Sequence, residues 1–199
     1  MNTNPINFRA IGIGLLGLMA VAGWQSSAMA ETPEQMMATA QKTRQPLDVV
    51  KAFLNHTSPD KVAAAAGQLV APDATYVSLN FDNPELKKIE PWTGTSKGPE
   101  AFVSTFTRVA KYWKIVDFRV SEMFASGDNV AVFGDFTYRS TAVGKQFNSP
   151  FSILAKVRDG KIVYFQFMED TYASASSFRT GGSWEVKTDP DSATYRVGE

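Results

Sequence analysis

The periodicity of the sequence changes near Ile115, and this change is the strongest constraint on the fold. From there onward apolar side chains recur at every second position, as in strands with one buried face. Three turn sequences interrupt the pattern: SGDN at 126–129, AVGK at 142–145 and RDGK at 158–161. The last contains Asp-Gly, a strong hairpin signal. The sequence therefore predicts four consecutive strands joined by turns.

Helical patterns precede these strands. Apolar residues in PLDVVKAFL (46–54) recur at helical spacing, and Ser-Pro at the start of 58–69 is typical of a second helix. DATYVSL (73–79) alternates as a strand, and a loop rich in Pro and Gly follows at 81–98. Pro99 then begins a third helix, whose apolar face is predicted to hold Phe102, Phe106, Val109 and Trp113. Helices followed by a run of hairpins indicate an α+β fold with an antiparallel sheet covered by helices on one face.

The first residues have the composition of a cleaved secretory signal. Residues 1–30 contain one Arg, no acidic residue, an apolar run at 11–23, and Ala28 and Ala30 at the spacing that signal peptidases recognise. We therefore expect the chain to be secreted across the inner membrane, with the periplasm as its location and Glu31 as the start of the mature protein.

The remaining chain divides into three parts. Residues 31–44 form a polar lead, and 45–180 hold the predicted domain. Residues 181–199 are rich in turn-forming residues, so we expect a loosely ordered tail that Trp184 can pin back to the domain.

Several classes of site are excluded by composition. The chain has no cysteine, which rules out disulfides, thiolate metal sites and a cysteine nucleophile. Its single histidine, His56, lies in a polar turn, so we expect no metal site and no cofactor. The 20 basic and 20 acidic residues balance, which predicts no broad attraction to nucleic acid or to a membrane surface.

The last predicted strand ends in YFQFMEDT (164–171), where two carboxylates are adjacent. Phe165 and Phe167 share one face by alternation, and Glu169 continues that face, so we expect its carboxylate in the interior. Asp170 directly precedes TYASASSF, a predicted closing helix, and Asp is a preferred N-cap. The two acids are therefore predicted to have different roles.

The order of these motifs resembles the nuclear transport factor 2-like superfamily, and within it the SnoaL-like and ketosteroid isomerase-related proteins. The resemblance lies in APDATYVSL after two helices, PWTGTSKGPEAF before the third, the long hairpins, and DGKIVYFQFMEDT before a helix. It covers roughly Leu47 to Phe178. It implies a cone in which a strongly bent sheet wraps around three helices. It also implies an apolar cavity open at one end and frequent dimerisation through the outer face of the sheet.

The resemblance also identifies positions that carry catalysis in relatives, and most hold other residue types here. The base, oxyanion-hole tyrosine and protonated aspartate of ketosteroid isomerases correspond to Ser78, Phe53 and Ile153. The charged residues of limonene-epoxide-hydrolase-like proteins correspond to Gly134, Phe136 and Phe167. Neither set of acids and donors is present. In SnoaL-like cyclases the acid near the end of the last strand corresponds to Asp170 or, with a bulge, to Glu169.

Two functions remain open from the sequence. The first is a binding module that holds a small, largely apolar or aromatic ligand in the cone, with Glu169 as polar anchor. The second is an acid/base enzyme of isomerase, cyclase or hydrolase type that uses Glu169 or Asp170, with surrounding aromatic rings raising the pKa of Glu169. The residues predicted to line the cavity are Phe53, Tyr76, Ser78, Trp92, Phe106, Phe136, Phe151, Phe165 and Phe167. Any one of these phenylalanines can equally be a core residue.

The outer face of the sheet is a candidate surface for self-association. It is predicted to present Phe133, Asp135, Arg139, Tyr164 and Met168, a mixture of aromatic, apolar and charged side chains that is common at interfaces. A homodimer through this face is compatible with either function.

Overall fold

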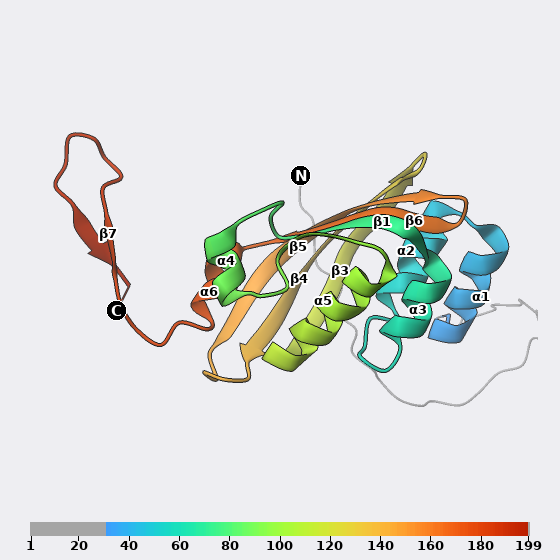
Figure 1. Ribbon diagram of the computed structural model, residues 1–199, viewed down its shortest axis with the longest axis horizontal. Coiled ribbons are helices and arrows are strands. Elements are labelled where there is room, and N and C mark those ends of the chain that lie inside the picture. The colour runs from blue at the N-terminus through green and yellow to red at the C-terminus, as the bar shows by residue number, and fades with distance from the viewer. Residues whose placement is uncertain (1–30, 199) are drawn as a thin grey trace, which may run out of the picture. The chain divides into compact units, whose positions relative to one another are not determined.

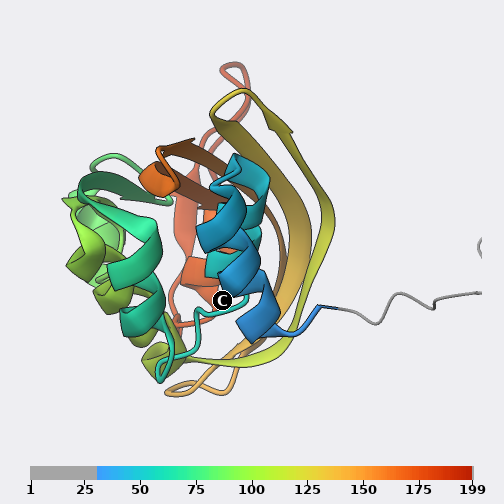
Figure 2. The same ribbon diagram turned by 90° about the vertical axis from the view of Figure 1, so that its right-hand side faces the viewer.

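The computed structural model describes residues 31–198. Its main feature is a six-stranded sheet in the order β2-β1-β6-β5-β4-β3. The strands are β1 (Val70–Ser78), β2 (Gly94–Lys97), β3 (Trp113–Ser126), β4 (Asn129–Ser140), β5 (Gln146–Arg158) and β6 (Lys161–Glu169). The long strands curve strongly around the helices (Figure 2). The predicted α+β fold with a bent sheet is confirmed.

The four strands predicted after Ile115 are present and pair in sequence. β3, β4, β5 and β6 form consecutive antiparallel pairs. Asp159 and Gly160 make the last turn with φ of 53° and 73°, the left-handed backbone that an Asp-Gly hairpin requires.

One pair differs from the expected antiparallel pattern, because β1 runs parallel to β6. β6 lies between β1 and β5, so it closes the sheet against the first strand. The register places Tyr76 beside Phe165 and Ser78 beside Phe167, and Phe167 in turn lies beside Ile153 of β5. Side chains from three strands thus form rows on the same face of the sheet.

Within residues 31–198, six helices accompany the sheet (Figure 1). They are α1 (Pro33–Thr43), α2 (Pro46–Leu54), α3 (Val62–Leu69), α4 (Pro84–Ile89), α5 (Pro99–Tyr112) and α6 (Thr171–Ser176). Proline stands at the first helical position of α1, α2, α4 and α5, where its fixed φ suits the helix and its missing N–H is not needed. None of the helices described is both long and apolar enough to cross a membrane.

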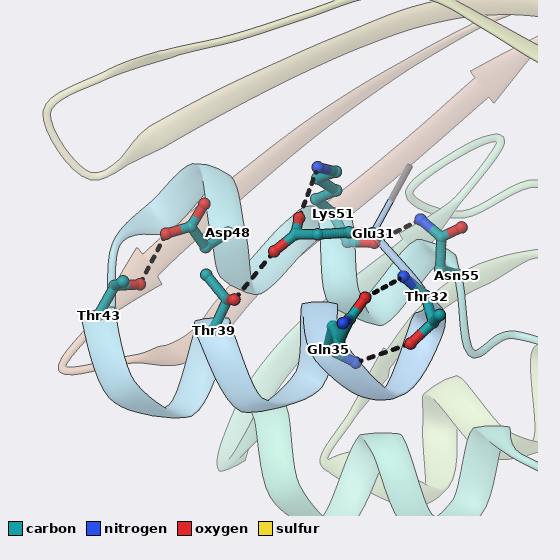
Figure 3. Close-up of polar contacts among 8 residues, drawn as sticks. All are labelled: Glu31, Thr32, Gln35, Thr39, Thr43, Asp48, Lys51 and Asn55. Carbon is teal, nitrogen blue, oxygen red and sulfur yellow. Dashed lines mark hydrogen bonds and ion pairs between the residues drawn. The ribbon is translucent and has the colours of Figure 1, made fainter. Parts of the chain in front are cut away.

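The polar lead predicted at 31–44 is largely helical, because α1 occupies most of it. Thr32 and Gln35 form a capping box: Thr32 Oγ1 accepts from the Gln35 amide at 3.2 Å, and Gln35 Oε1 accepts from the Thr32 amide at 2.8 Å. Glu31 bonds Lys51 of α2 at 3.1 Å and Thr39 at 3.0 Å (Figure 3). These contacts hold α1 against α2.

Two further boundaries also differ from the sequence expectation. The helix expected from residue 58 begins at Val62. In the turn before it, the Ser58 carbonyl accepts hydrogen bonds from the amides of Lys61 and Val62. The tail contains a hairpin, β7 (Trp184–Val186) with β8 (Tyr195–Val197), rather than being loosely ordered throughout. The predicted packing of Trp184 is present, edge-on against Tyr172 with ring centroids 5.4 Å apart.

The core lies between the sheet and α2, α3 and α5. Phe53 of α2 and Phe102 of α5 meet edge to face at 5.5 Å, and both contact Phe165 of β6. Tyr76 stacks on Phe165 with centroids 5.4 Å apart and an interplanar angle of 10°. These four rings belong to the core, and Tyr76 also lines the cavity described below.

The opposite face of the sheet presents apolar side chains to solvent. Phe133 is 44% and Met168 40% exposed, and both pair with Ser152 of β5, so they lie in one row across three strands. Asp135 forms an ion pair with Arg119 of β3, with the nearest oxygen at 2.9 Å.

Candidate functional site

A cavity of about 410 Å³ opens between the helices and the inner face of the sheet. Its walls come from the end of α2, from β1, from the segment after α4, from α5 and from β3 to β6. The lining includes Leu54, Tyr76, Ser78, Leu79, Trp92, Thr105, Phe106, Val109, Trp113, Phe118, Tyr138, Ile153, Phe167 and Glu169. Its size and mostly apolar walls suit one small organic molecule.

Glu169 is the acidic residue of this cavity. It is the last residue of β6, two positions after Phe167, which also lines the cavity, so the interior placement predicted from alternation is confirmed. Its Oε1 atom is buried and has no hydrogen-bond partner among the described residues.

Burial changes the chemistry of this carboxyl. It raises the pKa of Glu169 from 4.5 to about 8, and the nearby carboxyls of Glu90 and Asp170 contribute to the rise, while the Ser174 hydroxyl partly opposes it. At neutral pH Glu169 is therefore mainly a neutral acid that can donate a proton.

Asp170 has a different position, outside the cavity lining. Its side chain accepts a 3.0 Å hydrogen bond from the Ala173 amide and caps α6, as predicted. Its own amide donates to Ser149 Oγ at 2.8 Å, which anchors the start of α6 to β5. The geometry thus assigns Asp170 to the local structure and leaves Glu169 as the acid that faces the cavity.

Four predicted lining residues pack in the core instead: Phe53, Phe136, Phe151 and Phe165. Their side chains lie on the predicted side of each helix or strand, but other aromatic rings lie between them and the cavity. Phe118, for example, stacks on Phe151 at 4.7 Å and itself lines the cavity. Alternation fixes the side of a strand on which a residue lies, but not its depth below the cavity wall.

The other predicted lining residues Tyr76, Ser78, Trp92, Phe106 and Phe167 do face the cavity. Sequence reasoning did not assign Tyr138 and Trp113 to the site. Alternation could have found Tyr138, which shares the buried face of β4 with Phe136. Trp113 was expected on the face of the third helix, but it is the first residue of β3.

Two tyrosines bring hydroxyl groups to the acid. Burial raises the pKa of Tyr76 and of Tyr138 above the ordinary value, and the negative charge of ionised Glu169 adds to both shifts. Both phenols therefore remain protonated at physiological pH and can donate hydrogen bonds near Glu169. No Lys, Arg or His lines the cavity within the described chain, so its walls carry no positive charge.

A second buried carboxyl, Glu90, lies at the end of α4 and is not among the residues that line the cavity. It is 0% exposed, and neither of its oxygens has a hydrogen-bond partner in the described residues. Burial raises the pKa of Glu90 to about 7, and the Ser174 hydroxyl again partly opposes the rise. In the sequence this residue lies in the stretch that was expected to be a loop rich in Pro and Gly, so neither the helix α4 nor the burial of Glu90 at its end was predicted.

The described residues hold no cluster of three or more His, Asp or Glu side chains that could bind a metal ion. The polar side chains of the cavity are hydroxyls, the Asn55 amide, the indoles of Trp92 and Trp113, and one carboxyl, a set suited to hydrogen bonding and proton transfer.

Comparison with known proteins agrees with this architecture. Residues 50–165 match the SnoaL-like domain family. Patulin synthesis protein F of Aspergillus clavatus is 46% identical over 143 residues, which cover 70% of this chain and 72% of that protein. Patulin biosynthesis cluster protein F of Penicillium expansum is 42% identical over 146 residues, covering 72% and 73%.

Solved structures show the same fold. An NTF2-like protein from Burkholderia thailandensis is 22% identical with a TM-score of 0.59, covering 69% of this chain and 99% of that one. TerC, co-crystallised with polyporic acid, is 19% identical with a TM-score of 0.56, covering 67% and 97%. The chain belongs to the SnoaL-like family within the NTF2-like superfamily.

Proposed function

We propose that this protein is an acid/base enzyme that binds a small, largely apolar, uncharged molecule in its cavity and uses Glu169 to transfer protons to and from it. The observation that carries the proposal is the position of Glu169, a carboxyl with a buried, unpartnered oxygen in the wall of an apolar cavity.

The protonation behaviour of Glu169 supports this role. A general acid or base works best when its pKa lies near the operating pH, since both forms are then accessible during turnover. The raised pKa of about 8 meets this condition, whereas an ordinary glutamate is almost fully ionised at neutral pH. A ligand hydroxyl or carbonyl placed beside Oε1 also supplies the hydrogen bond that this atom lacks.

The neighbouring donors support a substrate with a carbonyl group. Tyr76, Tyr138 and Ser78 line the cavity with hydroxyl groups that can stabilise negative charge as it develops on a substrate oxygen. The absence of Lys, Arg and His from the described lining disfavours a substrate that is anionic when it enters. The chemistry that fits is proton transfer with rearrangement or ring closure, without a change in oxidation state.

The relatives suggest where such a step belongs. Both curated relatives are named for patulin synthesis. We propose that this chain acts on a small metabolite of comparable biosynthesis.

A binding protein without turnover is the second candidate. The ketosteroid isomerase positions Phe53 and Ile153 are apolar here, so Glu169 has no second acidic partner inside the cavity lining. In that case Glu169 would only anchor a ligand.

One experiment separates the two candidates. The purified protein is incubated with metabolite extract from a Penicillium expansum culture lacking its protein F, and products are followed by mass spectrometry. The wild type should consume one compound and form a product of equal mass, or of a mass differing by water. Glu169→Gln should abolish this conversion, while the capping-compatible Asp170→Asn should retain it. Binding detected by native mass spectrometry without conversion would favour the binding protein, and full activity of Glu169→Gln would refute the proposed role.

We also propose that the chain is exported. The support is the sequence pattern of residues 1–30, which lie outside the described residues. The same pattern directs a protein to the periplasm in bacteria and into the secretory pathway in fungi.

A further inference from the structure

Glu90 is a buried acid that the proposed chemistry does not use. It caps the C-terminus of α4, between the buried residues Leu86 and Trp92, and is 0% exposed. Both its carboxyl oxygens lack hydrogen-bond partners among the described residues, as does the hydroxyl of nearby Thr93. A buried ionised carboxylate without a partner is strongly destabilising, so this group is retained at a cost to folding.

The end of α4 and the start of α6 bring this acid to the site. Both helices lie at the same end of the sheet (Figure 1). Trp92 packs edge-on against Phe178 after α6, with centroids 6.2 Å apart. Ser174 of α6 is completely buried and donates to the Thr171 carbonyl at 3.3 Å, and its hydroxyl opposes the rise in the pKa of both Glu90 and Glu169.

Within residues 31–198, no salt bridge joins a cation to Glu90 or Glu169. Glu169 faces Glu90, Asp170 and the phenols of Tyr76 and Tyr138. Two cations approach the segment around Glu90 without reaching its carboxyl: Arg108 donates to the Pro91 carbonyl at 3.0 Å, and Lys88 pairs with Glu85 at 2.6 Å.

We propose that Glu90 is a positioning residue for Glu169: the two buried carboxyls titrate as a coupled pair, in which Glu90 keeps Glu169 protonated at neutral pH. Glu90 does not line the cavity, so it acts through Glu169 and does not contact the ligand. The catalytic consequence rests on the proposed function, but the coupling itself does not.

The physical reason is that two neighbouring carboxyls in an apolar environment do not ionise independently. Loss of the first proton leaves a negative charge that disfavours loss of the second, so the pair titrates in two separated steps. Glu169 then remains protonated at neutral pH and can donate its proton, although it lines a cavity that water can enter. After Glu169 has given its proton to a substrate, both carboxyls are ionised and their repulsion favours the return of a proton to Glu169 from solvent or product.

Titration of the unliganded full chain tests the coupling without knowledge of the substrate. Glutamate is labelled at its carboxyl carbon with ¹³C, and the two buried signals are assigned by their loss in Glu90→Gln and Glu169→Gln. In the wild type, the Glu169 signal should follow two inflections. In Glu90→Gln the Glu169 signal should show a single inflection, and its midpoint should be lowered by about one pH unit. An interaction of about this size is what makes two titrations coupled. Glu169→Gln should lower the midpoint of Glu90 by the same amount, because coupling is reciprocal.

Glu85→Gln is the matched control, since Glu85 belongs to α4 but its side chain is 80% exposed. It should leave the Glu169 curve unchanged. An unchanged Glu169 midpoint in Glu90→Gln, or a single inflection in the wild type, would overturn the proposal; the wild-type curve decides even if Glu90→Gln does not fold. A metabolite assay in which Glu169→Gln stays active would refute the proposed function and leave the coupling intact, so the two failures are distinguishable.

Discussion

The indole Nε1 of Trp113 donates a buried 2.9 Å hydrogen bond to Ser177 Oγ, and this bond ties the cavity wall to the residue that follows α6. Ser177 Oγ in turn donates to the Ser174 carbonyl at 2.6 Å. The Trp113 ring also stacks on Phe178 at 5.1 Å. The helix α6, which begins at Thr171, is thus fixed to Trp113 in the cavity wall.

Ser177→Ala should therefore destabilise the fold by about 1–3 kcal/mol, because it leaves a buried indole N–H without an acceptor. Urea unfolding measures the change. The matched control is Ser176→Ala, a less buried neighbour with no side-chain hydrogen bond among those found, which should stay within about 0.5 kcal/mol of the wild type. Equal losses in both variants would show that the bond to Trp113 contributes nothing.

Asp170 should behave as a helix cap. Asp170→Ala removes the 3.0 Å acceptor of the Ala173 amide and should cost about 1 kcal/mol of unfolding free energy. Asp170→Asn and Asp170→Ser keep an acceptor and should cost much less. If Asn is as damaging to turnover as Ala while stability is unchanged, Asp170 has a chemical role instead.

Stability should depend on pH through the two buried acids. The folded-state pKa values of Glu90 and Glu169 are raised from 4.5 to about 7 and about 8, so the folded protein holds these protons more tightly than the unfolded chain does. Their contribution to stability is fully present below pH 4.5 and is lost as the pH rises toward 8. Unfolding free energies measured in urea at several pH values should therefore fall across this window.

Glu169→Gln should flatten that fall, because glutamine does not ionise, and should be more stable than the wild type on the alkaline side. Glu85→Gln should reproduce the wild-type slope, since this exposed side chain has no buried charge to relieve. A slope that is the same in all three proteins would mean that Glu169 is not buried in solution.

The hydroxyl of Tyr76 should contribute to turnover. Tyr76→Phe keeps the ring stacked on Phe165 but removes a donor near the acid, so the rate of metabolite conversion should fall by about 100-fold with little loss of stability. Tyr164→Phe is the control, because that hydroxyl bonds Gln166 at 2.9 Å and does not line the cavity. Equal rates in the two variants would remove Tyr76 from the mechanism.

Export should leave a mature chain that starts at Glu31, after Ala28-Met29-Ala30. N-terminal sequencing of the protein recovered from the exported fraction tests this prediction. A first residue within 11–23, or a full-length chain retained in the cytoplasm, would contradict it.

Local rules in the sequence determined the parts of the site that depend on neighbouring residues. Strand alternation is set by the backbone itself, so it placed Glu169 on the inner face with Phe167. Helix capping involves residues three positions apart, so the role of Asp170 could be predicted as well. The hairpin at Asp159 and Gly160 followed from turn chemistry in the same way.

Only the tertiary structure decided how deeply a side chain is buried and which strands pair when they are far apart in the chain. The sequence indicated the side on which Phe53, Phe136, Phe151 and Phe165 lie, but rings from distant elements determine that they are core residues and not cavity wall. The parallel pairing of β1 with β6 likewise joins segments far apart in the chain.

The burial of Glu90 shows the same limit most clearly. In the sequence it lies in a stretch expected to be a loop, whereas in the structure it ends α4 as a fully buried acid, and the segment after it packs against Phe178 beyond α6. The loss of solvent around a carboxyl depends on every segment that packs over it, and its pKa follows from that loss. The sequence by itself therefore determined which way Glu169 points, while tertiary packing decided its protonation state and supplied its neighbour.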